Sequence, residues 1–304
     1  MSIFGKTSEI LGLNARNLLY ITQYNSRANK KFADDKIYTK HFLQARGIGV
    51  ARLYATIKSL SELKNFNKNV LPKSFVVKPN KGYGGEGIIT IKDKQADVYI
   101  GLNGQRYKWA DLYNHCISIL DGRFAISGLR DTVIFEELLE SHDYFKKYIE
   151  SGLPDIRIIV FKYVPIIAML RLPTAASQGK ANLHIGAIGL GIDIGTGKTT
   201  FGVQNNRLIK KLPSGESVRS LIIPQWDDIL KTAVNTQHIT QIGYLAVDLA
   251  LTKNGIKILE VNARAGLAIQ ISNQVLLRKR LEKVADLKVS TPAEGVKIGK
   301  TLFT

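Results

Sequence analysis

Three oxygen-bearing side chains in the last quarter of the chain have the types and spacing of a magnesium site. Asp248 lies in one expected strand (residues 244–251), and Glu260 and Asn262 lie two residues apart at the end of the next. Side chains at positions i and i+2 of a strand point to the same face, and Mg²⁺ takes hard oxygen ligands together with water and nucleotide phosphates. A polar, solvated strand face is the alternative. Apolar residues alternate with these acids in a hairpin expected to be buried, so the pattern favours a metal site.

A loop with four glycines in the first third of the chain has the composition of a phosphate-binding site. It follows an apolar strand (residues 74–78) that ends at Lys78, and its glycines are Gly82, Gly84, Gly85 and Gly87. Glycine lets backbone N–H groups approach phosphate oxygens closely, and the Lys78 ammonium is placed to neutralise them. No helix follows directly, so the loop is neither of the two common glycine-rich nucleotide motifs. For this segment alone, a glycine-rich hairpin turn is an equally good interpretation.

Carboxylates and cations at the ends of further expected strands form two weaker patterns. Residues 132–140 run from an apolar strand into Glu136 and Glu137. Backbone groups at such a strand end can contact an adenine edge while a carboxylate accepts ribose hydroxyls, although a solvated helix start explains the residues equally well. Arg157, Arg171 and Asn182 supply cations and an amide on neighbouring stretches, and arginine suits carboxylate and phosphoryl groups through bidentate contacts.

The elements that would position these residues follow from hydrophobic patterning. Short apolar and β-branched runs predict strands over residues 74–78, 88–92, 132–136, 155–161, 165–172, 183–192, 201–203, 207–209, 244–251 and 256–261. Helices are expected over 36–46, 107–120 and 224–237, and the last has one apolar face: Trp226, Ile229, Leu230, Ala233 and Val234. Residues 195–199 end like a P-loop but lack its first glycine and lie between strands, which favours a hairpin turn. Hairpins with few intervening helices favour an α+β fold with antiparallel sheets and a cleft between lobes.

The first 34 residues predict a basic helical arm. Ser8 is the candidate N-cap, and the apolar face is expected to hold Leu11, Ala15, Leu18 and Leu19. The whole chain of 304 residues carries 43 Lys and Arg against 25 Asp and Glu, a formal charge of +18. This surplus favours a polyanionic partner: nucleic acid, an anionic membrane surface, a nucleotide or an acidic substrate.

Composition excludes several classes of protein. Hydrophobic residues make up 45% of the chain and charged residues 22%, which argues against disorder. The single cysteine, Cys116, rules out an intrachain disulfide and a cysteine-based zinc site, and it fits a reducing, cytoplasmic compartment. No apolar run approaches the length of a membrane span, and the first residues lack a signal-peptide pattern.

Taken in order, these motifs resemble the ATP-grasp superfamily. The closer resemblance is to the ribosomal-protein-modifying α-L-glutamate ligases and the α-L-glutamate ligase-like group, which is similar to the sugar-transfer-associated ATP-grasp proteins. It covers about residues 34–275 and rests on these segments: Asp35-Lys36, VVKPNKGYGGEGI, FEELLE, LPDIRIIV, KANLHIGA, and ILEVNARAGL after VDLAL. The implied ATP-grasp fold has a basic arm (1–34), an N-terminal lobe with a glycine-rich lid (35–139) and a C-terminal lobe with a magnesium site (140–304). The usual pre-ATP-grasp domain is expected to be absent.

The resemblance also implies residue roles. The nucleotide-binding residues would be Lys36 and Lys78 on the phosphates, Gly82, Gly84, Gly85 and Gly87 in the lid, and Glu136, Glu137 and Leu139 at the adenine hinge. The ligands of two Mg²⁺ ions, with Mn²⁺ as an alternative, would be Asp248, Glu260 and Asn262, with Glu260 bridging. The catalytic set near the γ-phosphate and the substrate carboxylate would be Arg157, Arg171, Asn182 and Arg264.

The implied activity is ATP-dependent carboxylate–amine ligation through an acylphosphate, adding glutamate or another amino acid to an acidic acceptor. A phosphotransferase and a non-catalytic nucleotide-binding module are the alternatives. Ile185 and Arg264 depart from the glutamate-ligase pattern, so glutamate itself does not follow from the resemblance. A homodimer or partner protein that completes the acceptor site is a further hypothesis. The basic arm and residues 278–280 would dock an acidic peptide, an acidic partner or an anionic membrane face. Nucleic acid is not expected, because aromatic residues are not interleaved with the basic ones.

Overall fold

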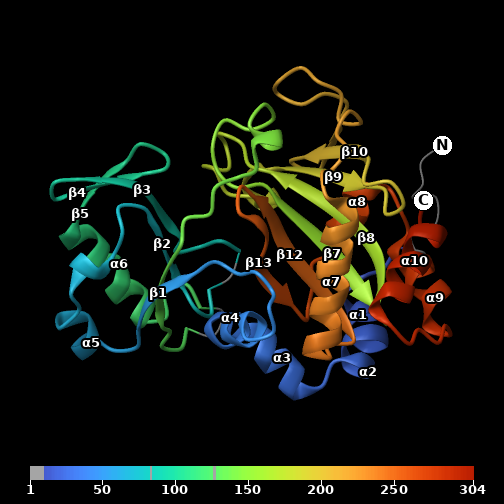
Figure 1. Ribbon diagram of the computed structural model, residues 1–304, viewed down its shortest axis with the longest axis horizontal. Helices are drawn as coiled ribbons and strands as arrows, with labels where there is room; N and C mark the ends of the chain where they lie inside the picture. Colours follow the sequence, from blue (N-terminus) through green and yellow to red (C-terminus); the bar gives the residue numbers. More distant parts are fainter. Residues whose placement is uncertain (1–9, 83, 126–127) are drawn as a thin grey trace.

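Two antiparallel sheets organise the molecule (Figure 1). The computed structural model describes residues 10–82, 84–125 and 128–304. A six-stranded sheet has the order β1-β6-β2-β3-β4-β5, and a seven-stranded sheet has the order β11-β10-β9-β8-β7-β12-β13. The predicted α+β class with antiparallel sheets is confirmed. No helix in the part of the chain that the structure describes is long and apolar enough to cross a bilayer.

The six-stranded sheet carries the glycine-rich loop. Its strands are β1 (Leu53–Ile57), β2 (Phe75–Pro79), β3 (Ile89–Gln95), β4 (Val98–Gly101), β5 (Arg106–Lys108) and β6 (Val133–Glu136). Helices α5 (Leu60–Lys64) and α6 (Trp109–Leu120) accompany it, and a separate apolar core joins α6 to the buried strands β2 and β6. The two short strands β4 and β5 were not predicted, because residues 98–108 carry no sustained apolar alternation.

The seven-stranded sheet holds the larger core. Its strands are β7 (Asp155–Phe161), β8 (Val164–Leu172), β9 (Ile188–Ile192), β10 (Thr199–Gln204), β11 (Arg207–Ile209), β12 (Tyr244–Thr252) and β13 (Gly255–Asn262). Its helices are α7 (Trp226–Thr240), α8 (Ile269–Asn273), α9 (Leu277–Ala285) and α10 (Pro292–Leu302). The predicted apolar face of α7 is confirmed, since all five of its residues are buried against this core.

Two local predictions for this sheet had different outcomes. The strand expected over 183–192 is wrong in its first half, which forms a 3₁₀ turn (Leu183–Ile185) before β9. Asn182 begins that turn by accepting a hydrogen bond from the His184 amide at 3.0 Å, which is local capping that competes with a strand. The hairpin turn at 195–199 is confirmed, because it joins the antiparallel strands β9 and β10.

In Figure 1 the N-terminal arm lies along the lower edge of the larger sheet. Its C-terminal end reaches the region between the two sheets. Its described part consists of α1 (Leu13–Arg16), a π-helical turn (Asn17–Ile21), α2 (Thr22–Tyr24) and α3 (Arg27–Asp34). Helix α4 (Lys36–Gln44) follows it. The expected apolar face is partly wrong: Leu11 is buried, but Leu18 is 65% exposed and Ile21 is buried. The π-helical turn places more residues in one turn, so the buried face shifts along the chain. Ser8 lies outside the described residues.

Candidate functional site

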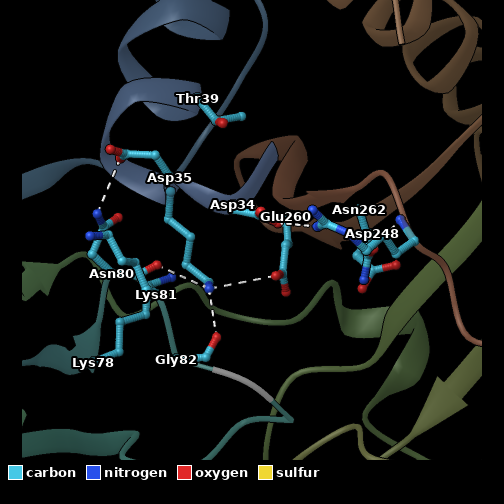
Figure 2. A network of polar contacts seen from close by, with 12 residues as sticks. Asp34, Asp35, Thr39, Lys78, Asn80, Lys81, Gly82, Asp248, Glu260 and Asn262 are labelled. Carbon is cyan, nitrogen blue, oxygen red and sulfur yellow. Dashed lines mark hydrogen bonds and ion pairs between the residues drawn. The ribbon is translucent and has the colours of Figure 1, made fainter. Parts of the chain in front are cut away.

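Lys36 connects the glycine-rich loop with strand β13. Its ammonium donates to the carbonyls of Asn80 at 3.1 Å and Gly82 at 2.9 Å, and it lies 3.6 Å from a Glu260 carboxylate oxygen (Figure 2). Asp35 caps α4 by accepting from the Tyr38 amide, which fixes the helix start and therefore the position of Lys36. Residues predicted from separate motifs to bind phosphates and metal thus lie side by side.

A buried cluster of three charges lies next to this junction. Glu136 at the end of β6 accepts Lys78 of β2 at 2.5 Å and lies 3.1 Å from the ammonium of Lys40 on α4. Burial raises the pKa of Glu136, but the two ammonium groups outweigh it and hold the pKa below its usual value. Burial lowers the pKa of Lys40, against the attraction of Glu136. With one carboxylate for two ammonium groups, the cluster carries a net positive charge and favours an anion nearby.

The other two predicted hinge residues follow β6. The Glu137 carboxylate accepts from the Arg52 amide at 3.0 Å, and the Glu137 amide donates to the Arg52 carbonyl at 2.8 Å. This pairing ties the end of β6 to the segment before β1. Leu139 is half-buried two residues further on. The adenine-binding role of these residues stays a prediction.

The lid glycines adopt conformations that few other residues tolerate. Gly84, Gly85 and Gly87 have φ values of +63°, +78° and +69°. Asn182 donates its amide to the Gly84 carbonyl at 2.6 Å, and a ring nitrogen of His115 lies 2.8 Å from the Gly87 carbonyl. The connection between β8 and β9 therefore contacts the lid through Asn182, for which the resemblance implies a catalytic role.

The three predicted metal ligands share one face of β12 and β13. Asp248 lies opposite Glu260, and Asn262 lies opposite Ala246, so the strand alternation brings the three side chains together (Figure 2). Glu260 remains 38% exposed and has Lys36 beside it. The Asn262 side-chain oxygen accepts from the Arg264 amide at 2.7 Å.

Asp248 is engaged by two arginines from the neighbouring strands. Its Oδ1 accepts from Arg157 Nε at 2.7 Å, and its Oδ2 accepts from Arg157 at 2.6 Å and Arg171 at 2.8 Å. Arg171 also forms a bidentate pair with Asp155, at 2.5 and 2.6 Å. The cross-strand register explains the set, because Arg157 faces Asp248 and Arg171 faces Asp155. The buried network contains two cations and two anions and is balanced in charge.

The pKa values of the two aspartates in this network shift in opposite directions. Burial raises the pKa of Asp248, but Arg157 and Arg171 outweigh burial and lower it to about 2. For Asp155, burial together with the charge of Asp248 exceeds the effect of Arg171 and raises the pKa to about 6. The fourth predicted catalytic residue, Arg264, is more exposed and pairs with Asp34 at 2.6 Å.

The donor chemistry fits a magnesium ion that keeps water and phosphate ligands. Glu260 offers an accessible carboxylate, and Asn262 offers an amide oxygen on the same face. Asp248 can join them by exchanging a guanidinium donor for the metal. Across residues 10–82, 84–125 and 128–304, no group of three or more His, Cys, Asp or Glu side chains is placed to hold a metal. The candidate set thus depends on the asparagine and on ligands from outside the chain.

Sequence reasoning missed Lys40 and Asp155. Lys40 follows Lys36 by four residues, so the two share a helix face, and this spacing was the available signal. Asp155 stands two residues before Arg157 on the same strand face, and this spacing was the available signal. Cavity size gives no guidance, since a hollow of about 430 Å³ lies away from the site, around Thr56, Asn65 and Phe66.

Comparisons with known proteins identify the family. The sequence model described as sugar-transfer associated ATP-grasp matches residues 15–286. The solved structure of the ATP-grasp ligase PsnB with a minimal precursor is similar over 87% of this chain and 64% of that chain, with 15% identity and a TM-score of 0.46. The D-alanine–D-alanine ligase of Bacillus anthracis with ATP is similar over 84% and 69%, with 17% identity and a TM-score of 0.46. D-cycloserine synthetase DcsG is similar over 85% and 71%, with 16% identity and a TM-score of 0.46.

The family match extends over most of the sequence, whereas the chain spans only about 64% of the length of the PsnB chain. Comparison with curated proteins found no match. The matched region includes the glycine-rich loop, the charge cluster and the β12–β13 hairpin. The order of its motifs predicted the ATP-grasp superfamily and a likeness to this group. The protein therefore belongs to the sugar-transfer associated ATP-grasp family.

Proposed function

We propose that the protein is an ATP-dependent carboxylate–amine ligase that uses Mg²⁺ and adds glutamate or another amino acid to an acidic acceptor. The observation that carries the proposal is the position of Lys36, which contacts the glycine-rich loop and lies beside Glu260. Phosphoryl activation needs cations for the phosphates within reach of oxygen ligands for the metal. Membership of an ATP-grasp family supports the same assignment.

Each part of the site has a proposed task. When bound, Mg·ATP would supply the phosphoryl group that activates a carboxylate as an acylphosphate, from which the amine displaces phosphate. Lys36 and Lys78 would hold phosphate oxygens, and the glycine-rich loop would cover them. Glu260 and Asn262, joined by Asp248, would hold the metal. The backbone from Glu136 to Leu139 would contact the adenine edge.

The arginine network would stabilise the transferred group. Arg157 and Arg171 are largely buried cations whose geometry is held by Asp155 and Asp248. Fixed cations in a site of low dielectric stabilise developing negative charge without reorganising. Arg264 is more accessible and is our candidate for the acceptor carboxylate, in exchange for Asp34. Acidic acceptors suit the net charge of +18, and a homodimer or partner protein would complete their site.

The test is a screen of amino acids and acidic peptides with Mg·ATP, with release of ADP and phosphate measured and products identified by mass spectrometry. Ligation predicts ADP, free phosphate and a product lighter than the two substrates together by one water. Glu260→Gln should abolish turnover, whereas Glu282→Gln on the exposed face of α9 should not. A phosphorylated product without free phosphate would establish the phosphotransferase instead. Nucleotide binding without turnover across the screen would favour the non-catalytic module.

A further inference from the structure

Three consecutive carbonyl groups directly after Asn262 are held by side chains of the N-terminal arm (residues 10–34). Asn25 donates to the carbonyl of residue 263 at 3.0 Å. Arg16 donates to the next two carbonyls, at 3.2 and 2.6 Å. We call residues 263–265 the post-metal turn. Every backbone acceptor of this turn is thus occupied by a side chain more than 230 positions earlier in the sequence.

Asn25 joins this turn to the start of β12. Its amide also donates to the Tyr244 carbonyl at 2.8 Å, and its oxygen accepts from the Tyr244 amide at 2.8 Å. The side chain is 2% exposed, so no solvent competes for these bonds. One asparagine therefore links the beginning of the strand that carries Asp248 to the end of the strand that carries Asn262.

Arg16 is a buried cation whose hydrogen bonds in the described residues go to neutral oxygens. Besides the two carbonyls, its guanidinium donates to the Asn17 side-chain oxygen at 3.1 and 2.8 Å. Burial lowers the pKa of Arg16. A guanidinium buried without a carboxylate is costly unless its donors are satisfied, so the turn must keep its carbonyls where Arg16 reaches them.

The conformation of the turn determines how Asn262 is presented. The Asn262 side-chain oxygen accepts from the Arg264 amide, which lies between two carbonyls that the arm holds. The Arg264 side chain pairs with Asp34 at the end of the arm. Both the amide that orients Asn262 and the cation proposed for the acceptor therefore depend on the arm.

We propose that the N-terminal arm is a positioning element of the active site, with Arg16 and Asn25 as positioning residues that set the post-metal turn. This inference rests on the proposed function for its catalytic consequence, because it assumes that Asn262 binds the metal. It assigns Arg16 to the interior rather than to a docking surface. Loosening the turn would weaken the binding of metal and nucleotide before it changed the overall fold.

The chain offers a matched control for the arm. Asn29 donates its side-chain amide to the Gln241 carbonyl at 2.7 Å, which is the same type of bond from the same arm but outside the post-metal turn. The variants are Asn25→Ala, Arg16→Met, the conservative Arg16→Lys, and the control Asn29→Ala. Circular dichroism of each full-length variant reports whether it folds.

The first measurement is amide hydrogen exchange of residues 259–270, which requires no activity. We expect faster exchange in Asn25→Ala and Arg16→Met, an intermediate rate in Arg16→Lys, and the wild-type rate in Asn29→Ala. The second is calorimetric titration of Mg²⁺ with a non-hydrolysable ATP analogue. Removing an outer-shell partner of a metal ligand typically lowers the metal affinity by about 10–100-fold. We therefore expect roughly a tenfold loss of Mg²⁺ affinity in Asn25→Ala and Arg16→Met.

The outcomes separate the arm from the proposed function. Unchanged exchange in both Asn25→Ala and Arg16→Met would overturn the positioning role. Faster exchange with unchanged Mg²⁺ affinity would also overturn it, because the turn would then be irrelevant to the metal. Wild-type protein that fails to bind Mg·nucleotide would defeat the proposed function and, with it, the catalytic part of the inference. If Arg16→Met does not fold, Asn25→Ala and Arg16→Lys decide the matter.

Discussion

The buried cluster of Lys40, Lys78 and Glu136 allows a prediction whose sign is set by the count of charges. Glu136→Gln keeps the shape of the side chain but removes the carboxylate that contacts both ammonium groups. Lys40→Met instead removes one ammonium and leaves Glu136 paired with Lys78 at 2.5 Å. One substitution leaves two ammonium groups without their carboxylate, and the other leaves one ion pair intact. The two should therefore differ strongly in their effect on the free energy of unfolding.

The magnitude follows from distance and burial. With an effective dielectric constant of about 20, Glu136 attracts the ammonium of Lys78 at 2.5 Å by about 7 kcal/mol and that of Lys40 at 3.1 Å by about 5 kcal/mol. Desolvation offsets most of this attraction. Breaking a buried pair by removing one partner typically costs about 3–5 kcal/mol, which we expect for Glu136→Gln. Lys40→Met should cost less than about 1.5 kcal/mol, because a methionine needs no partner and Glu136 keeps one.

Urea unfolding at pH 7 measures these values, and the double variant provides the decisive comparison. Lys40→Met in the Glu136→Gln background removes one of two unpaired ammonium groups. The double variant should therefore be more stable than Glu136→Gln alone. A double variant less stable than Glu136→Gln, or single variants of equal cost, would refute this account of the cluster.

Three further predictions address the other sites. The folded-state pKa of Asp155 is raised to about 6, so the contribution of this carboxyl group to the free energy of unfolding is present at low pH and is lost, by roughly 3 kcal/mol, as pH rises from about 4 to 6. Asp155→Asn should remove this dependence of the free energy of unfolding on pH, as measured by urea unfolding. An unchanged pH dependence would contradict the prediction. Asn182→Ala removes the lid contact to Gly84, so KM for ATP should rise about 2–10-fold with a smaller change in kcat; a large loss of kcat at constant KM would instead favour the catalytic role that the resemblance implies. Ile21→Ala should cost about 2–5 kcal/mol in thermal unfolding and Leu18→Ala less than about 0.5 kcal/mol, and equal costs would contradict the shifted face of the arm.

Local periodicity was sufficient to predict several elements. The five apolar residues predicted to form one face of α7 recur at helical spacing, and all five are buried. In β13, the spacing of two residues placed Glu260 and Asn262 on one face, which the register with β12 confirms. These features depend on residues close in sequence, whose geometry is set by the repeat of a helix or a strand.

The arm shows where local reasoning failed. Helical spacing placed Leu18 inside, but the π-helical turn changes the spacing and buries Ile21. The sequence of the arm does not indicate which segment it contacts, and that segment is a turn more than 230 residues away. From the sequence, Arg16 is one more residue of a basic surface, whereas the tertiary structure places it against two carbonyl groups of the post-metal turn.

By itself, the sequence determined the fold class, the ATP-grasp superfamily through the order of its motifs, and the face of β13 that Glu260 and Asn262 share. The tertiary structure alone decided which charges meet: Arg157 and Arg171 at Asp248, Lys40 and Lys78 at Glu136, and the arm at the post-metal turn. The physical reason is range. Periodicity reports which face a residue shares with its near neighbours, whereas strand order and helix packing bring together groups far apart in the chain, and these contacts set the charge balance of the site.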